Sequence, residues 1–410
     1  MDFTEIPYPT DIKLRIANRE WAKYHGQEVN TNEPYPSPLT KEEVLKNYSF
    51  EELDKIALET ITPMIMKNSL PQLVQHLMGV CKDDMEKLRI IFRWVTSPKL
   101  KEINTDNSSP ETVGYEIKNL FETHNIISLF ARLCRLANIS CHIVTGVDKY
   151  LENDGTNKTD SLQMIECKWS IVKVSNKWYI CHPLYAWCHG YLKLDGWTLL
   201  NSTCESKCSQ NEIIYKYTET YFMSNPEQFI FRFFPDNPKN QLLARPLTMQ
   251  EFRDAAKMNV AFFNIGLSIL SHPRHAIETN KANNEIIFGI NENFDGDLSL
   301  QLFILSETVN NDKNQKMTMK DSPEKTHYIT FIDKNRARCV IWLRLPFPSQ
   351  YQFIIQQKET ILCMYSINYK IPPGANVQKE KLIFPKVASY NMGENDETRK
   401  LNFYNFNPQT

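Results

Sequence analysis

Glycine is scarce in this chain, with 12 among 410 residues. The sequence holds neither a GxGxxG pattern nor a P-loop, both of which need glycines where the backbone approaches phosphate. It also lacks the regular repeats that build solenoids and propellers. These absences argue against nucleotide binding and give no reason to expect a cofactor.

An excess of one charge and a long apolar run are missing as well. Lys and Arg number 47, and Asp and Glu 48, so neither nucleic acid nor an anionic membrane is an expected partner. The longest apolar run, residues 259–270, is too short and too polar for insertion into a membrane. The first residues, MDFTEIPYPT, do not have the charged and apolar regions of a signal peptide. We therefore expect a cytoplasmic protein whose ten cysteines are reduced thiols.

The first half of the chain is mainly helical in pattern. Residues 1–45 are polar and interrupted by prolines, which predicts an N-terminal arm that docks rather than folds alone. Apolar residues then recur at helical spacing, beginning after Thr40, a candidate helix cap. The stretch at 122–147, ETHNIISLFARLCRLANISCHIVTGV, predicts a helix followed by a buried strand. Thr123 stands at the amino end of that helix.

A hairpin is expected at 163–183, QMIECKWSIVKVSNKWYICHP. Apolar and polar residues alternate on both sides of SNK, as in two antiparallel strands joined by a short turn. If the turn has two residues, Trp169 faces His182, and Cys167 is a diagonal neighbour on the same face. A three-residue turn would change this parity.

Beyond about residue 222 the pattern changes again. Residues 223–280 are rich in Pro, Asn and aromatics and predict a connector that leads into a second domain. Short alternating stretches separated by turn residues occupy 281–395, which is typical of an antiparallel, Ig-like β-sandwich. Residues 396–410 predict a loose tail. The fold class is therefore α+β, with a domain of helices and antiparallel strands at 46–222 and a β-sandwich after it.

Several stretches resemble the kyphoscoliosis peptidase and hillarin branch of the transglutaminase-like superfamily. DDMEKLRIIFRWVT resembles the helix before its catalytic region, and LFARLCRLANISCHIVTGVDKY its nucleophile helix and next strand. KWSIVKVSNKWYICHPLYAW resembles its His-to-Asp hairpin, and YFMSNPEQFIFRFFPDNPKNQLLARPLTMQEF the segment that opens its second domain. The match covers roughly residues 80–265. It implies a papain-like core in which helices pack on an antiparallel sheet.

The catalytic triad of that family is substituted throughout. Counting back from Leu129, the position that the resemblance gives to the catalytic cysteine holds Thr123. The position of the histidine, two residues before Trp169, holds Cys167, and that of the aspartate holds His182. The resemblance therefore implies a protein that has kept the fold and lost the chemistry.

Cysteine catalysis needs a thiolate, an imidazole that generates it and a group that orients the imidazole. A threonine hydroxyl is too weakly acidic for this role, so we interpret Thr123 as a helix N-cap. Cys167 and His182 leave an alternative open, a displaced thiol–imidazole dyad. A thiol in mid-strand, however, lacks the helix terminus and the free N–H groups that stabilise an oxyanion. We favour a buried cysteine beside a half-exposed histidine.

Two further alternatives concern metal and peptide binding. A zinc site needs four ligands, but the spacings C-x6-C and C-x3-C are not those of a common zinc motif. The candidate ligands are Cys181, His182, Cys188, His189, Cys204 and Cys208. Four tryptophans could line a peptide groove, although core packing is their more frequent role. They are Trp169, Trp178, Trp187 and Trp197.

The sequence thus predicts a catalytically inactive, transglutaminase-like protein that binds another protein. The resemblance implies an adaptor associated with the cytoskeleton, since members of this branch are linked to cytoskeletal and muscle proteins. Either the former cleft or the C-terminal sandwich would carry the binding surface. The alternative is an active cysteine peptidase or acyl transferase that uses Cys167 and His182.

Overall fold

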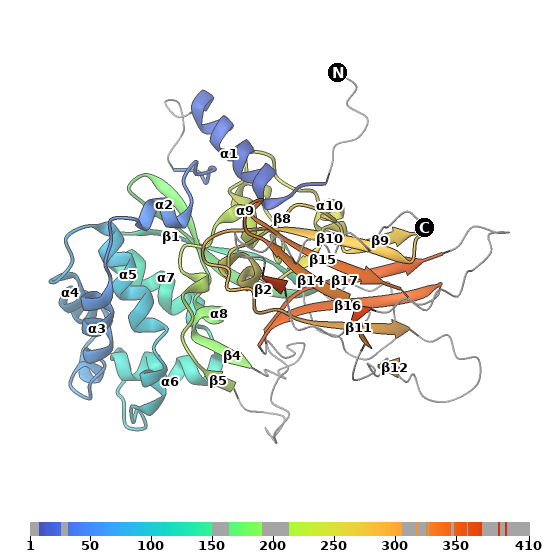
Figure 1. The fold of residues 1–410 in the computed structure, drawn as a ribbon. Helices are drawn as coiled ribbons and strands as arrows, with labels where there is room; N and C mark the ends of the chain where they lie inside the picture. Colours follow the sequence, from blue (N-terminus) through green and yellow to red (C-terminus); the bar gives the residue numbers. More distant parts are fainter. Residues whose placement is uncertain are drawn as a thin grey trace. The chain divides into compact units, whose positions relative to one another are not determined.

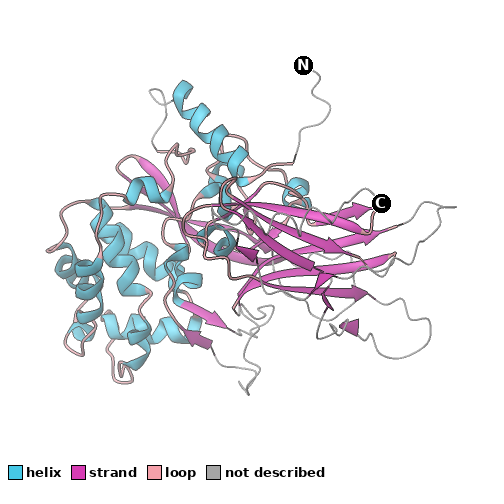
Figure 2. Ribbon diagram, viewed as in Figure 1, coloured by secondary structure: helices cyan, strands magenta, loops and turns pink. Residues whose placement is uncertain are grey.

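The chain folds as two compact units, and the division along the sequence falls between Arg253 and Asp254. That boundary lies inside the segment predicted to be a connector, so the described part of this segment up to Arg253 belongs to the first unit. The mixed α+β class is confirmed (Figure 1; Figure 2). The computed structural model describes residues 8–25, 32–149, 164–190, 213–305, 317–318, 325–326, 328–345, 348–358, 360–370, 384–385 and 390–391.

Helices dominate the beginning of the first unit. The N-terminal arm contains a long helix that its sequence did not predict, α1 (Asp11–His25). Thr40 and Ser69 each form a capping box. The side chain of the cap accepts a hydrogen bond from the backbone of the third helical residue, and the side chain of that residue accepts one from the backbone of the cap. The α-helices that follow α1 are α2 (Lys41–Leu45), α3 (Glu51–Glu59), α4 (Leu70–Met78), α5 (Asp84–Val95), α6 (Val113–Thr123), α7 (Ile126–Leu136), α8 (Pro183–Trp187), α9 (Pro226–Phe229) and α10 (Met249–Asp254). Short 3-10 helices are η1 (Ile65–Lys67), η2 (Pro98–Glu102), η3 (Glu219–Tyr221) and η4 (Pro238–Gln241).

An antiparallel sheet completes this unit, with the strand order β3-β2-β1-β6. Helices α5 and α7 pack together through apolar faces, and the rings of Phe92 and Phe130 meet edge to face, 5.7 Å between centroids. At Gly146 any Cβ would stand 2.2 Å from the Phe234 carbonyl oxygen, so only glycine lets β1 and β6 approach this closely. The strands are β1 (Ser140–Lys149), β2 (Met164–Val174), β3 (Lys177–Cys181) and β6 (Phe233–Pro235), beside a separate pair, β4 (Cys188–Gly190) and β5 (Ile213–Tyr215).

The second unit is built from two main sheets, as expected for an Ig-like sandwich. One has the order β19-β14-β15-β10-β8 and the other β12-β11-β16-β17-β7, with β9 parallel to β17 and β13 paired with β18. The long strands of this unit fall within the range 281–395 that the alternation of apolar residues predicted. The elements are β7 (Lys257–Met258), α11 (Val260–Asn264), β8 (Leu267–Ile269), β9 (Ala276–Thr279), β10 (Asn283–Ile290), β11 (Ser299–Leu305), β12 (Met317–Thr318), β13 (Lys325–Thr326), β14 (Tyr328–Asp333), β15 (Arg338–Arg344), β16 (Ser349–Gln357), β17 (Thr360–Tyr369), β18 (Phe384–Pro385) and β19 (Tyr390–Asn391).

The tail predicted at 396–410 lies outside the described residues. Among the helices that are described, none combines the length and the apolar character needed to cross a bilayer.

Candidate functional site

The hairpin of β2 and β3 sets the positions of Cys167 and His182, two of the three residues that the sequence predicted at the triad positions. Its turn consists of Ser175 and Asn176, with φ angles of 50° and 59°, the conformation whose twist suits a two-residue hairpin. The register that follows places Trp169 opposite His182, and their ring centroids are 6.4 Å apart. Cys167 lies two residues from Trp169 on the same strand, so the hairpin prediction is confirmed.

Thr123 is not the cap of the helix that was predicted to carry the nucleophile. It is the last residue of α6, and its hydroxyl donates to the Asn119 carbonyl at 2.7 Å. His124 then adopts a left-handed conformation (φ 56°), and the chain turns before α7. Asn125 is the true N-cap of α7, because its side-chain oxygen accepts the Ser128 N–H at 3.3 Å. The N-cap of α7 thus lies two residues after the predicted one, within the polar stretch ETHN at 122–125.

Cys167 and His182 are both enclosed in the core. Cys167 is 3% exposed and His182 is fully buried, so the expectation of a half-exposed histidine was wrong. Burial, with a smaller effect of the Asp148 carboxylate, raises the pKa of the Cys167 thiol well above its usual value. Burial and the Arg232 guanidinium hold the pKa of His182 well below its usual value. Both groups are therefore neutral at pH 7.

Hydrogen bonding at His182 also argues against a working dyad. Its Nδ1 accepts the backbone N–H of Tyr185 at 3.5 Å, which caps α8. In that tautomer Nε2 carries the proton, and within the described ranges Nε2 has no hydrogen-bond partner. A general base needs a free acceptor nitrogen close to the proton that it removes. The acceptor nitrogen of His182 instead bonds the backbone.

A buried ion pair fills the space beside these residues, and sequence reasoning missed it. Nε and Nη2 of Arg232 donate to the two carboxylate oxygens of Asp148 at 2.9 and 3.0 Å. Tyr185 donates its hydroxyl to the same carboxylate, and its ring centroid lies 4.8 Å from the Arg232 guanidinium. The two charges are 84 positions apart, and the only local signal was an arginine among the aromatics of FIFRFF.

The zinc alternative gains no support from the described residues. Among them, no three His, Cys, Asp or Glu side chains come together as metal ligands. Burial raises the pKa of Cys181 to about 12, and the Cys188 thiol donates to a carbonyl of α8 at 3.4 Å. Cys204 and Cys208 lie outside the described residues, as does the side chain of His189.

Three of the four tryptophans considered as groove residues belong to the core rather than to a groove. Trp169, Trp178 and Trp187 are at most 1% exposed. Rings from other elements surround Trp169, including Phe229 at a centroid distance of 5.4 Å. Trp197 lies outside the described residues. Core packing, the commoner role of buried aromatics, therefore holds for these three.

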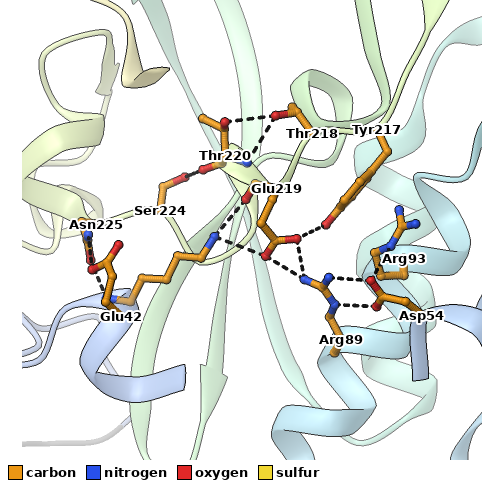
Figure 3. A network of polar contacts seen from close by, with 11 residues as sticks. Glu42, Asp54, Arg89, Arg93, Tyr217, Thr218, Glu219, Thr220, Ser224 and Asn225 are labelled. Carbon is orange, nitrogen blue, oxygen red and sulfur yellow. Dashed lines mark hydrogen bonds and ion pairs between the residues drawn. The ribbon is translucent and has the colours of Figure 1, made fainter. Parts of the chain in front are cut away.

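A second polar cluster joins three separate parts of the first unit (Figure 3). Arg89 on α5 donates to both oxygens of Asp54 on α3, at 2.7 Å, and to both oxygens of Glu219 on η3, at 2.8 Å. Arg93 donates to Asp54 at 3.1 Å and stacks on the ring of Tyr217, 3.5 Å from its centroid. Each carboxylate already has a cationic partner, so this cluster ties elements together rather than forming a reaction centre.

A hollow lies beside the N-terminal arm. Helix α1 is joined to α9 by the ion pair of Arg15 and Glu227, at 2.9 Å. Between α1 and the loop before α10 lies a pocket of about 410 Å³. Trp21 and Tyr35 stack along its wall with ring centroids 6.1 Å apart. The pocket holds no cluster of catalytic groups.

The two units define an α+β protein whose C-terminal part has the strand arrangement of an Ig-like sandwich. Residues 249–374 match the model of the KY-like, immunoglobulin-like domain. The chain is 28% identical to hillarin of Drosophila melanogaster over 58% of this chain and 29% of hillarin. It is 26% identical to Lim and transglutaminase domain protein ltd-1 of Caenorhabditis elegans, over 58% of this chain and 32% of that protein.

Kyphoscoliosis peptidase of Mus musculus is similar at 25% identity, over 55% of this chain and 31% of the peptidase. The chain is thus a distant homologue of hillarin, ltd-1 and kyphoscoliosis peptidase, which confirms the resemblance read from the sequence at that level. The aligned region spans about a third or less of each relative.

Proposed function

We propose that this chain is a catalytically inactive relative of the transglutaminase-like peptidases that serves as an intracellular protein-binding module. The observation that carries the proposal is the state of Cys167 and His182, two neutral, buried groups without the hydrogen bond of a nucleophile to its base. The substitution at Thr123 adds support, because its hydroxyl bonds the backbone of its own helix. The intact core explains why the fold persists without the chemistry.

Catalysis can be tested directly on the full chain. We expect no cleavage of casein, and no incorporation of a fluorescent primary amine into casein, above the level of the Cys167→Ala variant. Iodoacetamide at pH 7 should label Cys167 as slowly as Cys188, an equally buried thiol of the same unit. Activity or rapid labelling that disappears in His182→Ala would instead establish the displaced dyad, and with it an active cysteine peptidase or acyl transferase.

We further propose that the bound partner is cytoskeletal. The support is the distant homology to hillarin and kyphoscoliosis peptidase and the retention of an Ig-like domain, a fold commonly used for protein contacts. Co-sedimentation of the full chain with purified actin filaments and with microtubules tests this. Saturable sedimentation with one filament type is the expected result. A chain that stays in the supernatant at every filament concentration, as serum albumin does, would contradict it.

A further inference from the structure

One side of strand β1 is only partly covered by its neighbours. On one side, β1 pairs with β2 along its whole length, from Ser140 to Lys149. On the other side, it pairs with β6 over Gly146–Asp148 only. Among the strands that the structure describes, none pairs with residues 140–144 on this second side. The first half of β1 is therefore a sheet edge, although the second half lies inside the sheet.

The backbone groups that point to this edge follow from the hydrogen bonds of the covered half. The Lys149 N–H donates to the carbonyl just before β6 at 2.7 Å, and the Thr145 carbonyl accepts the Asp236 N–H at 3.0 Å. Successive residues of a strand direct their N–H and C=O groups to alternate sides. Because the register with β2 has no shift, Ile143 and Cys141 also direct their backbone groups to the β6 side.

A short stretch of this edge is left open between two polar contacts. At one end, the Thr145 hydroxyl donates to the Asp236 carboxylate at 2.6 Å. At the other end, Nη2 of Arg135 donates to the Cys141 carbonyl at 3.1 Å. Between them, neither the N–H nor the C=O of Ile143 has a hydrogen-bond partner on this side within the described ranges. The Ile143 side chain is 38% exposed, and an exposed apolar edge of this kind is a template for another chain.

The charged groups beside the open stretch are cations. Lys173 of β2 stands opposite Ser140, and Arg135 is exposed near the end of α7. Neither cation forms an ion pair with another residue that the structure describes. In an antiparallel pair, one added residue exchanges both N–H···O bonds with Ile143, and the residues after it run toward Arg135. Charge complementarity therefore favours acidic residues at that end of an added strand.

We propose that residues 140–143 of β1 bind an extended segment of another protein as an added antiparallel strand, with an apolar residue opposite Ile143 and acidic residues after it. This inference rests on the proposed protein-binding function and names its surface. Strand addition takes affinity from main-chain hydrogen bonds and specificity from side chains. A second copy of the chain is not the occupant. Pairing two copies about Ile143 would put Cys141 of the second copy opposite Thr145, the position that Asp236 occupies.

Fluorescence polarisation of the full chain with a labelled peptide tests the proposal. The probe is GSTVTEE, amidated at its carboxyl end, in which two glutamates follow the single valine on the side of Arg135. We expect saturable binding. N-methylation of the valine removes the donor to the Ile143 carbonyl, and it should weaken binding about tenfold, as should the basic peptide GSTVTKK. Equal binding of the three peptides, or no binding of the probe, would overturn the proposal.

Two charge reversals on the protein test the role of the cation. Arg135→Glu should weaken binding of the acidic probe about tenfold, the effect of losing one charge-assisted hydrogen bond. Lys99→Glu changes the net charge equally at an exposed lysine of η2, and it should leave the affinity unchanged. Equal losses in the two variants would show that only the net charge matters, and would remove Arg135 from the site.

Amide hydrogen exchange locates the bound peptide. The Ile143 N–H should exchange rapidly in the free chain and about tenfold more slowly with the probe bound, whereas the Val144 N–H, which points to β2, should be protected in both states. An Ile143 amide already protected in the free chain would overturn the open edge. Filament co-sedimentation is a separate measurement, so sedimentation without peptide binding overturns only the edge. Peptide binding without sedimentation overturns only the cytoskeletal partner.

Discussion

Arg232 and Asp148 form a doubly hydrogen-bonded ion pair inside the first unit, with at most 4% of either side chain exposed. The pair lies close enough to Cys167 and His182 to influence the pKa of both. Its charges satisfy each other, and Tyr185 supplies a further donor to the carboxylate. The interior around Cys167 and His182 is therefore polar and closed, which suits a structural core better than a reaction with water or peptide.

Replacing Arg232 with methionine should strongly destabilise the first unit. The substitution leaves the Asp148 carboxylate buried without a counter-ion, and loss of one partner of a buried pair costs about 3–5 kcal/mol. Urea unfolding followed by tryptophan fluorescence measures the change. As the control, Lys87→Met breaks a pair with Asp84 that is partly exposed, and it should cost less than about 1 kcal/mol. Equal losses in the two variants would contradict the assignment.

The position of the α7 cap gives a second prediction. Asn125→Ala should lower the free energy of unfolding by about 1 kcal/mol, because the Ser128 N–H loses its acceptor. Thr123→Ala should change it by less than about 0.5 kcal/mol, since this exposed residue lies at the end of α6. Denaturant titration of both variants compares the two sites, and a larger effect at Thr123 would restore it as the cap.

His182 should make stability dependent on pH below neutrality. Its pKa is held well below the usual value in the native state, while in the unfolded chain it titrates near 6.5. Below about pH 6.5 the unfolded state therefore binds more protons, and stability falls as the pH falls, by up to about 1.4 kcal/mol per pH unit from this group. Above about pH 6.5, His182 does not change the free energy of unfolding, because it is neutral in both states.

The variant His182→Gln isolates this contribution. It removes the titrating group, so stability measured between pH 7 and 5 should fall less steeply than in the natural chain, whatever the baseline stability of the variant. Parallel curves for the two proteins would show that His182 becomes protonated in the folded state.

The hairpin turn offers a stabilising substitution. Asn176 adopts a positive φ of 59°, and glycine takes this conformation without steric cost. Asn176→Gly should raise the free energy of unfolding by up to about 1 kcal/mol. Lys177→Gly, one residue further in β3, should instead lower it by about 0.5–1 kcal/mol. Thermal unfolding of both proteins checks the opposite signs.

Local patterns predicted the parts of the fold that depend on neighbouring residues. Alternation predicted the β2–β3 hairpin, and it predicted the register on the condition of a two-residue turn, which determines which residues face each other. The helix cap at Thr40 was predicted for the same reason, and the structure shows that it forms a capping box. Local pattern placed the start of α7 at Thr123, two residues before its true cap, Asn125. Both Thr and Asn are good N-cap residues, so the sequence alone did not distinguish the end of α6 from the start of α7.

The interior of the candidate site could not be predicted in this way. Whether His182 is exposed depends on aromatic residues more than 30 positions away, such as Phe229 and Phe233, whose rings pack against it. The pairing of Asp148 with Arg232 likewise depends on how β1 meets the segment before β6. Contacts of this kind follow from tertiary packing, which overrides the preferences of short stretches.

Arg89 binds at once to a carboxylate on α3 and to one on η3, from its own place on α5. If either segment unfolded locally, the nearly buried guanidinium of Arg89 would lose one of its two carboxylate partners. Local unfolding of α3 and local unfolding of η3 therefore share much of their free-energy cost. Amides in these distant stretches should therefore open in common events and exchange their hydrogens with similar protection. Local unfolding in the first unit is therefore coupled between segments that are distant in sequence, since Arg89 and Glu219 are 130 positions apart.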